Sequence, residues 1–489
     1  MRLFIKQNRY YIALISGIAL VNILLIFNNN VWCDEAFILN ACRYNIKELL
    51  IYIAKYDMRP PLYLVCIKIW SLIFGIGVPQ FKIFSIIPPI LVLIVGIRFI
   101  ECDLYGSKKY IATIYALLTG LSPIGLTKNI EITIYSWAFC FVTCSAIYAY
   151  KACKNTSKKN MVFFVLFSLL SSATHYFALV AVAYMYVFLF VFLIYKNKCY
   201  IKNCIYMILF TILGYLPILP FFLYQFGIAK KTFWITKVDI FTMLSSLRMP
   251  FEGENAFKFT NEFTMFFIIL GASALVFCLQ HIIESKSSKK ALDSDIVFCL
   301  CICGILLLFL LTAYIISKVI RPLYVTRYFY NVTGLYWLLL SIMSERMLKS
   351  KSFFMIGLIL TMFIFAYPQV YHREYATETK NSVAYLQSLV QPSDIFINNK
   401  EECASWVLNY YFPDNETFIN CSEGIYYKDY IFDFSSLNRT AWYLCNGDFD
   451  LDENILESNH LTCEEYGTIN LDNYYYFTLY KISANKQGD

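Results

Sequence analysis

The chain has few charged side chains for its length. Only 15% of its 489 residues are Asp, Glu, Lys or Arg, whereas 59% are hydrophobic and the mean hydropathy is +0.55. Soluble proteins carry about 25% charged residues. So few charges cannot cover a soluble surface, which excludes a soluble multidomain enzyme, a disordered chain and a fibrous one. The composition predicts an α-helical polytopic membrane protein.

Negative charge is scarce in the first three quarters of the sequence and abundant after them. Residues 368–489 contain 7 Lys and Arg against 19 Asp and Glu, and the preceding 367 residues contain 34 against 15. This contrast predicts two domains in two environments, a transmembrane domain over 1–367 and an acidic extracytoplasmic domain over 368–489. No basic strip with interleaved aromatic residues lies outside the predicted membrane region, so we expect no nucleic-acid partner.

Basic segments divide the apolar sequence and predict how it crosses the membrane, because loops rich in Lys and Arg stay in the cytoplasm. The N-terminus, with Arg2, Lys6 and Arg9, is predicted to be cytoplasmic. Each stretch between two cytoplasmic loops must cross an even number of times. Residues 161–195, bounded by lysines, therefore predict a hairpin with its outer tip near 172–176. The further basic loops are 107–109, 151–160, 196–202, 284–290 and 345–351.

The same parity rule predicts a long first outer loop. Three apolar stretches, 10–27, 60–77 and 81–100, lie between the first two basic segments, and only two of them can cross. The middle stretch opens with Pro60-Pro61 and contains Lys68, so it is predicted to be a juxtamembrane helix at the outer interface. About eleven transmembrane helices result, with an outer loop over 28–80 and the C-terminal domain outside the cell membrane.

The acidic tail predicts a small α/β domain. Its expected helices are 379–390 and 404–412, and its expected strands are 394–398, 417–421 and 474–482. The tail also contains four cysteines, which favour disulfides in an extracytoplasmic domain. Three pairings are open to them. The four are Cys403, Cys421, Cys445 and Cys463.

Acidic and histidine side chains stand at three predicted outer positions. Asp34 and Glu35 follow the first span, where they suit proton transfer or a divalent cation; the alternative is that Asp34 caps a short helix. Glu131 lies in an apolar stretch. It is either a functional acid, as acids within a membrane are by default, or a carboxylate at the membrane rim that is hydrated by headgroup water. His175, at the hairpin tip, is either a satisfied interfacial residue or a ligand or hydrogen-bond donor directed into an outer cavity.

Cations also gather at a predicted outer helix end, against the positive-inside bias. Lys318, Arg321 and Arg327 lie within ten residues of one another. Guanidinium groups match phosphate oxygens bidentately. We therefore expect an anionic ligand at the outer face.

Several short motifs occur in the order seen in one family of membrane enzymes. They are Asp34-Glu35, Pro60-Pro61-Leu62-Tyr63 with Lys68, Lys82-Ile83-Phe84-Ser85, Glu131 with Tyr135, Thr174-His175-Tyr176-Phe177 and Arg327-Tyr328. Together they resemble the GT-C class of integral-membrane glycosyltransferases, in the branch of the dolichyl-phosphate-mannose protein mannosyltransferases and the aminoarabinose transferases. The chain departs from the motif Gln-Glu-x-Arg-x-Tyr by having Ile130 and Thr133, and the second change removes a cation.

The resemblance implies roles for particular residues. It makes Asp34, Glu35 and Glu131 catalytic. It makes Arg59, Lys82, Arg321 and Arg327 ligands of a donor phosphate. It places Tyr63, Lys68, Tyr135, His175 and Tyr328 at the substrate. For Asp34, Glu131 and His175 it leaves open a second role, as ligands of a divalent cation (Mg, Mn or Zn).

The resemblance also implies a reaction. A sugar would move from a polyprenyl-phosphate donor to a hydroxyl of a glycan, lipid or protein acceptor at the extracytoplasmic face, with inversion. The family's partners are thus the lipid-linked donor, the acceptor and the membrane lipids. Two alternatives remain: a transporter or flippase of lipid-linked sugars, and a non-catalytic family member. No halves of the sequence repeat, which speaks against a transporter.

Overall fold

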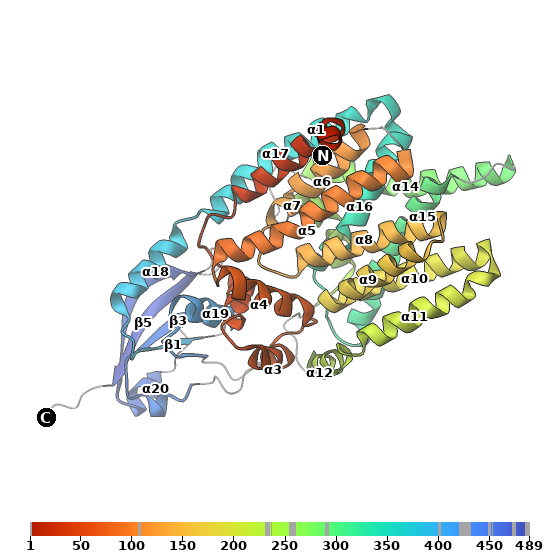
Figure 1. Ribbon diagram of the computed structural model, residues 1–489. Coiled ribbons are helices and arrows are strands. Elements are labelled where there is room, and N and C mark those ends of the chain that lie inside the picture. Colours follow the sequence, from red (N-terminus) through yellow and green to blue (C-terminus); the bar gives the residue numbers. More distant parts are fainter. Residues whose placement is uncertain are drawn as a thin grey trace. The chain divides into compact units, whose positions relative to one another are not determined.

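The computed structural model divides the chain into two compact units (Figure 1). The first, called the helical unit here, comprises Met1–Ile26, Ile53–Ile67 and Lys82–Val370. The second, the mixed unit, comprises Phe27–Tyr52, Lys68–Phe81 and Tyr371–Asp489. The structure describes residues 2–105, 109–229, 235, 237–253, 261–288, 293–399, 402–419, 432–447, 451, 453–471 and 476–484.

Helices account for most of the described chain up to residue 389. The shorter ones, several of them in the first outer loop, are α2 (Cys33–Ala41), α3 (Ile46–Tyr56), α4 (Leu62–Phe74), α6 (Lys109–Leu121), α7 (Pro123–Lys128), α12 (Leu219–Ala229), α13 (Ile240–Glu252), α16 (Tyr330–Met343) and α18 (Glu378–Leu389). The longer ones are α1 (Arg2–Ile23), α5 (Val78–Phe99), α8 (Tyr135–Lys154), α9 (Lys158–Thr174), α10 (Tyr176–Lys196), α11 (Ile201–Tyr215), α14 (Asn261–Ser287), α15 (Ser294–Val319) and α17 (Phe353–Glu374).

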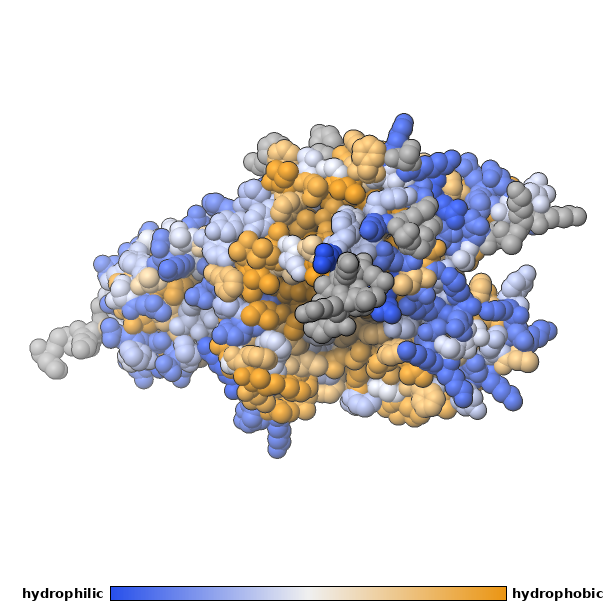
Figure 2. All heavy atoms as spheres, turned by 45° about the horizontal axis from the view of Figure 1, so that its top comes forward, coloured by the Kyte–Doolittle hydropathy of each residue, from blue (hydrophilic) through white to orange (hydrophobic). Residues whose placement is uncertain are grey.

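Several of these helices are suited to a bilayer. Five described segments are long and apolar enough to cross one, and α11 with α12, bent by 66° at their junction, form a sixth candidate. Apolar side chains gather over the helices in Figure 2, and hydrophilic ones lie at the right-hand end, where Figure 1 places the end of α10 and the start of α11. The chain is thus a multi-pass membrane protein. The number eleven stays a prediction.

The hairpin predicted between two lysine-rich loops is confirmed. Helices α9 and α10 meet at His175, whose extended backbone ends one helix and begins the next. The middle stretch of the first outer loop is also helical, as α4. Its 13 residues rise only about 20 Å, which is less than the roughly 30 Å of a bilayer core. This length agrees with a juxtamembrane rather than a spanning helix.

The core of the helical unit lies around α16. Every residue of α16 is buried, and the helix packs against α6, α8, α14 and α15. A helix that is apolar on all sides belongs in an interior. Its Gly334 lets α8 approach closely, because a Cβ at that position would collide with Thr143 Oγ1.

A five-stranded mixed sheet forms the centre of the C-terminal part of the mixed unit. Its strands are β1 (Ile395–Asn398), β2 (Thr417–Ile419), β3 (Ala441–Cys445), β4 (Leu461–Asn470) and β5 (Tyr476–Ala484), in the order β2-β1-β3-β5-β4. The first three are parallel, and β5 runs antiparallel to β3 and β4. Helices α19 (Glu402–Tyr411) and α20 (Glu453–Ser458) pack against the sheet.

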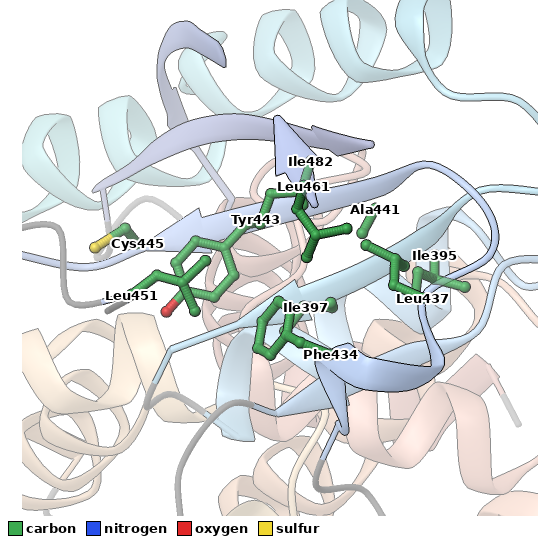
Figure 3. Packing of buried hydrophobic residues seen from close by; sticks show 10 residues of the cluster. All are labelled: Ile395, Ile397, Phe434, Leu437, Ala441, Tyr443, Cys445, Leu451, Leu461 and Ile482. Atoms are coloured by element: carbon green, nitrogen blue, oxygen red, sulfur yellow. The ribbon is translucent and has the colours of Figure 1, made fainter. Parts of the chain in front are cut away.

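A hydrophobic core lies against the sheet. Figure 3 shows Phe434, from the short helix Phe434–Ser436, beside Ile397 of β1, with Tyr443 of β3 and Ile482 of β5 in the same cluster. Strand β3 is buried along its whole length, as a central strand covered on both faces must be. The tail is therefore the small α/β domain that the sequence predicted, with each predicted helix and strand observed and β3, β4 and α20 in addition.

Register excludes one of the three disulfide pairings. Cys445 is opposite Thr478 on β5, and Cys463 is opposite Ile482 on the other side of β5. Two strand spacings, at about 4.8 Å each, already separate these cysteines by more than the roughly 7 Å that a disulfide spans. They cannot pair with each other. Residue 421 and the side chain of residue 403 lie outside the described part of the chain.

Candidate active site

A cavity of about 270 Å³ opens in the helical unit beside the tip of the α9–α10 hairpin. The residues that line it come from the segment before α4, the first turns of α10, helix α12 and the chain between α15 and α16. Most are apolar, among them Phe177, Phe222 and Leu323. The polar groups on its wall belong to Arg59, His175, Tyr176, Gln225 and Tyr328. An apolar cavity with a few polar groups is the usual form of a ligand site.

Arg59 is held on the cavity wall by a local network. Its Nε donates to Oδ1 of the buried Asp57 at 2.6 Å, and its backbone N–H donates to the same oxygen at 3.2 Å. Gln225 Nε2 donates to the backbone oxygens of Arg59 and Ile53, at 3.1 and 3.2 Å, while Tyr176 O–H donates to Gln225 Oε1 at 2.5 Å. The guanidinium is thus fixed in place, which suits it to meet an anion without a large entropic cost.

His175 presents a hydrogen-bond donor rather than a base. Its Nδ1 accepts the backbone N–H of Phe177 at 3.0 Å. Burial, together with the guanidinium groups of Arg59 and Arg327, lowers the pKa of His175 to about 3. The ring is therefore neutral at physiological pH, and because Nδ1 accepts, the single proton is on Nε2. No side chain in the described residues hydrogen-bonds Nε2, and the ring lines the cavity.

The late basic motif reaches the same site, because Tyr328 lines the cavity beside His175. Arg327 and Tyr328 lie in a short 3-10 helix, Thr326–Phe329. The Tyr328 ring stands edge-on to His175, with centroids 4.8 Å apart, and also contacts Tyr135 at 6.4 Å. Such edge-on pairs fix ring orientation as well as burying area.

A buried ion pair lies next to this aromatic group. Lys128, at the end of α7, is fully buried, and its Nζ pairs with Glu131 Oε2. The same ammonium lies 5.0 Å from the centroid of the Tyr135 ring. The following residue, Asn129, accepts from Tyr330 O–H at 2.6 Å and donates to Thr119 O at 3.2 Å. The residue after Lys128 is therefore anchored to both α6 and α16.

The other predicted cations of the helical unit do not line the cavity. Lys82 is 1% exposed in the first turns of α5, and Arg321 is half-buried after α15. Neither is among the residues that line the cavity. Tyr63, in the first turn of α4, is buried with its ring 5.9 Å from Phe84. Their assignment to donor or substrate stays a prediction.

The acidic pair belongs to the mixed unit, in the first turn of α2. Helix α2 begins at Cys33 after the N-cap Trp32, so Asp34 is not its cap. Glu35, which is 4% exposed, accepts the backbone N–H of Trp32 at 3.4 Å and so has a helix-capping role. The half-buried Asp34 remains the stronger candidate for proton transfer.

The C-terminal domain holds α2 in place. Asn40 Nδ2 donates to Trp406 O at 2.8 Å, and the Phe37 ring meets the Trp406 ring with centroids 5.0 Å apart. Arg43 donates to the carbonyl oxygens of Asn409 and Tyr410 at the end of α19, at 2.9 and 3.1 Å. A cation there also complements the negative end of that helix.

Lys68 has a structural partner in the same unit. Its Nζ donates to Cys42 O at 2.7 Å, and the side chain is buried. This bond ties α4 to the turn that follows α2. Lys68 therefore has a structural role that does not depend on substrate.

The predicted metal ligands do not form a metal site in the described part of the chain. No group of three or more His, Cys, Asp or Glu side chains there could hold a metal ion. The tautomer of His175 explains part of this, since both ring nitrogens are engaged or protonated, and Glu131 is paired with Lys128.

Sequence reasoning missed Lys128, Asp57 and Gln225. A lysine at an outer tip looks like a solvated cation, and only its spacing of three residues from Glu131 points to an ion pair. Asp57 precedes Arg59 by two residues, which is a similarly weak signal. Gln225 gives none, because it contacts the site only after α12 has folded against residues 53–59.

The fold is that of the GT-C class of membrane proteins, as predicted from the motifs. The chain is similar to the crystal structure of ArnT from Cupriavidus metallidurans in the apo state, with 11% identity, a TM-score of 0.58 and coverage of 97% of this chain and 98% of that chain. It is also similar to the same protein bound to undecaprenyl phosphate, with 11% identity, a TM-score of 0.54 and coverage of 96% and 98%. Neither a protein-family model nor a curated protein sequence matches the chain.

Proposed function

We propose that this protein is an integral-membrane glycosyltransferase that moves a sugar from a polyprenyl-phosphate donor to a hydroxyl acceptor. The observation that carries the proposal is the apolar cavity with Arg59, His175 and Tyr328 on its wall. A structurally similar protein, ArnT, has been crystallised with undecaprenyl phosphate. An apolar cavity that also presents a fixed guanidinium suits a ligand with an isoprenyl chain and a phosphate.

In this proposal the working face is extracytoplasmic and the N-terminus is cytoplasmic. Nucleotide sugars are not available outside the membrane, so the donor must be anchored in the lipid. Residues 1–367 bind the donor, and the acidic domain over 368–489 lies outside. The transferred sugar is a hexose or a pentose, and the acceptor is a glycan, a lipid or a protein.

The proposed reaction is an inverting displacement. Asp34 takes the proton of the acceptor hydroxyl, the acceptor oxygen forms a bond to the anomeric carbon, and the bond from that carbon to the donor phosphate breaks. Polyprenyl phosphate leaves with the electron pair. Arg59 and Arg327 neutralise the charge that develops on this phosphate, and the Nε2–H of His175 donates to one of its oxygens. Removing one such oriented contact typically costs about 3–4 kcal/mol of transition-state stabilisation.

The other predicted site residues have supporting parts in this scheme. Glu131, oriented by Lys128, holds the acceptor, and Tyr135 and Tyr328 border the sugar. Lys82 and Arg321 add positive charge near the phosphate, and Tyr63 contacts the substrate. A divalent cation stays an optional component, to be tested by adding EDTA and then Mg, Mn or Zn to the assay.

The test uses the full-length protein in nanodiscs with a set of radiolabelled polyprenyl-phosphate sugars. Release of lipid phosphate with labelling of an acceptor identifies a transferase. Movement of the lipid across the membrane without release identifies a transporter. If neither release nor movement is observed, the protein is a non-catalytic binding protein.

Asp34→Asn tests the proposed base. We expect it to abolish transfer while the protein stays folded and still binds the donor. Asp414→Asn, at an exposed carboxylate of the same unit, is the matched control and should keep full activity. Wild-type activity in Asp34→Asn would reject Asp34 as the base.

A further inference from the structure

A second cavity, of about 280 Å³, lies between α8, α10 and α15, far from the first. It is lined near the last turns of α8 and α10 and the first turns of α15, by residues that include Ala149, Lys154, Phe188, Ser294 and Ile302. From Tyr135, beside the candidate active site, α8 rises about 28 Å before it reaches Lys154. The second cavity is therefore at the opposite end of these helices.

Two ammonium groups stand at one end of this cavity. Lys154, an exposed residue of the lining, donates from Nζ to Asp103 O at 2.5 Å. Lys196 Nζ donates to the carbonyl oxygen of Cys153, another lining residue, at 3.2 Å. The carboxylate of Asp103 pairs instead with Lys151 at 3.0 Å. Among the described residues no carboxylate pairs with Lys154 or Lys196, so the end of the cavity is positively charged.

Hydroxyl groups come next, and the rest of the wall is apolar. Tyr150 O–H and Ser294 Oγ lie 3.1 Å apart on the lining. Beyond them, Phe188 of α10 faces α15, where a Cβ at Gly304 would come within 2.9 Å of its ring. Small side chains on α8, such as Ala149, leave the space open. Along the cavity wall, the ammonium groups are thus followed by hydroxyl groups and then by apolar side chains.

The cavity reaches the surface that faces lipid. Phe192 belongs to its lining and is 39% exposed, and its neighbour Val191 is 64% exposed on the same helix. In a membrane such apolar exposure is contact with lipid. A ligand can therefore enter sideways from the bilayer without passing through water.

We propose that this cavity binds one anionic glycerophospholipid of the cytoplasmic leaflet. The lipid phosphate lies between Lys154 and Lys196, an ester oxygen accepts the one hydroxyl proton that the Tyr150–Ser294 pair does not use internally, and one acyl chain lies against Phe188. The lysine-rich loops at this end are predicted to be cytoplasmic, and that leaflet is rich in anionic lipids, which basic pockets between helices bind. The site is independent of the sugar donor, because it lies at the other membrane surface.

The test measures which lipids stay bound to the full-length protein by native mass spectrometry after reconstitution with phosphatidylglycerol, phosphatidylcholine or undecaprenyl phosphate. We expect phosphatidylglycerol adducts to be retained and phosphatidylcholine adducts to be lost. Lys154→Gln with Lys196→Gln should lower phosphatidylglycerol retention at least about 10-fold. Lys202→Gln, an exposed lysine on α11 that does not line the cavity, should leave retention unchanged.

A second variant separates shape from charge. Ala149→Leu should fill the cavity and remove the adduct without changing any charge, and circular dichroism and the melting temperature in phosphatidylcholine should confirm that each variant is folded. If Ala149→Leu does not fold, phosphatidylglycerol retention by the double variant Lys154→Gln with Lys196→Gln is the deciding measurement. Equal retention in the lysine pair and in wild type would overturn the proposal. Undecaprenyl phosphate that competes out phosphatidylglycerol and depends on the same lysines would also overturn it.

Discussion

The ion pair between Lys128 and Glu131 gives a sharp prediction, because both partners are buried. The Lys128 side chain is 0% exposed and that of Glu131 is 10% exposed. An exposed pair of this kind contributes about 0–1 kcal/mol. A buried one behaves differently, since removing one partner leaves the other charge in a medium that cannot solvate it, at a cost of about 3–5 kcal/mol.

Lys128→Met should therefore lower the free energy of unfolding by about 3 kcal/mol or more. Methionine retains most of the buried methylene chain, so loss of packing is small and the effect reports the charge. Lys128→Met with Glu131→Gln removes both charges and should recover most of the loss, with a coupling energy of about 2 kcal/mol. Glu131→Gln alone leaves the ammonium buried and should also destabilise.

The measurement is equilibrium unfolding in mixed micelles, for the four proteins of this double-mutant cycle, with sugar transfer assayed well below each melting temperature. Lys318→Met is the control, because that lysine lies at the end of α15, outside the pair. A loss below about 1 kcal/mol in Lys128→Met, or additive effects in the double variant, would show that the pair is solvated and refute the reasoning.

Three further predictions concern stability and positioning. Because the pKa of His175 is lowered in the folded protein, between pH 6.5 and pH 3 the unfolded chain binds a proton there that the folded protein does not. The free energy of unfolding should therefore fall as the pH falls through this range, by roughly 1 kcal/mol per pH unit. His175→Gln, compared with wild type in unfolding titrations at pH 7 and pH 5, should abolish this slope. Trp406→Ala should lower kcat about 10-fold with little change in the donor KM, because α2 and its Asp34 lose the ring that packs on Phe37, and an equal rise in KM would contradict this. Gly334→Val should destabilise by about 1–3 kcal/mol by forcing α16 from α8, and an unchanged melting temperature would contradict the close packing.

The parts of the fold that the sequence predicted well are those set by local pattern and by charge. Lysines at both ends of 161–195 required a hairpin, and the turn indeed falls at His175. The tail strands β1 and β5 were visible from their own composition. Strand β4, with the sequence Leu-Thr-Cys-Glu-Glu-Tyr-Gly-Thr-Ile-Asn, was not, because its polar residues make sense only at a sheet edge, paired on one side with β5.

The candidate site was predictable in its residue types but not in its partnerships. The sequence pointed to His175 as either an interfacial residue or a hydrogen-bond donor, and the structure favours the second because Phe177 N–H occupies Nδ1. That bond depends on where one helix stops and the next begins. Likewise, the motif that contains Lys68 gave no sign that its Nζ donates to Cys42 O. Long side chains bridge segments that no local pattern relates.

The missing cation of the second outer motif illustrates the same point. The motif that this chain resembles has an arginine at the position of Thr133, whose side chain is fully buried in this protein. A cation nevertheless meets Glu131, supplied by Lys128 from the other side of the same short segment. Electrostatics depends on where a charge lies in space and not on its position in a motif. The acidic side chain thus keeps a cationic partner although the motif is broken, and the departure at Thr133 does not argue against a working site.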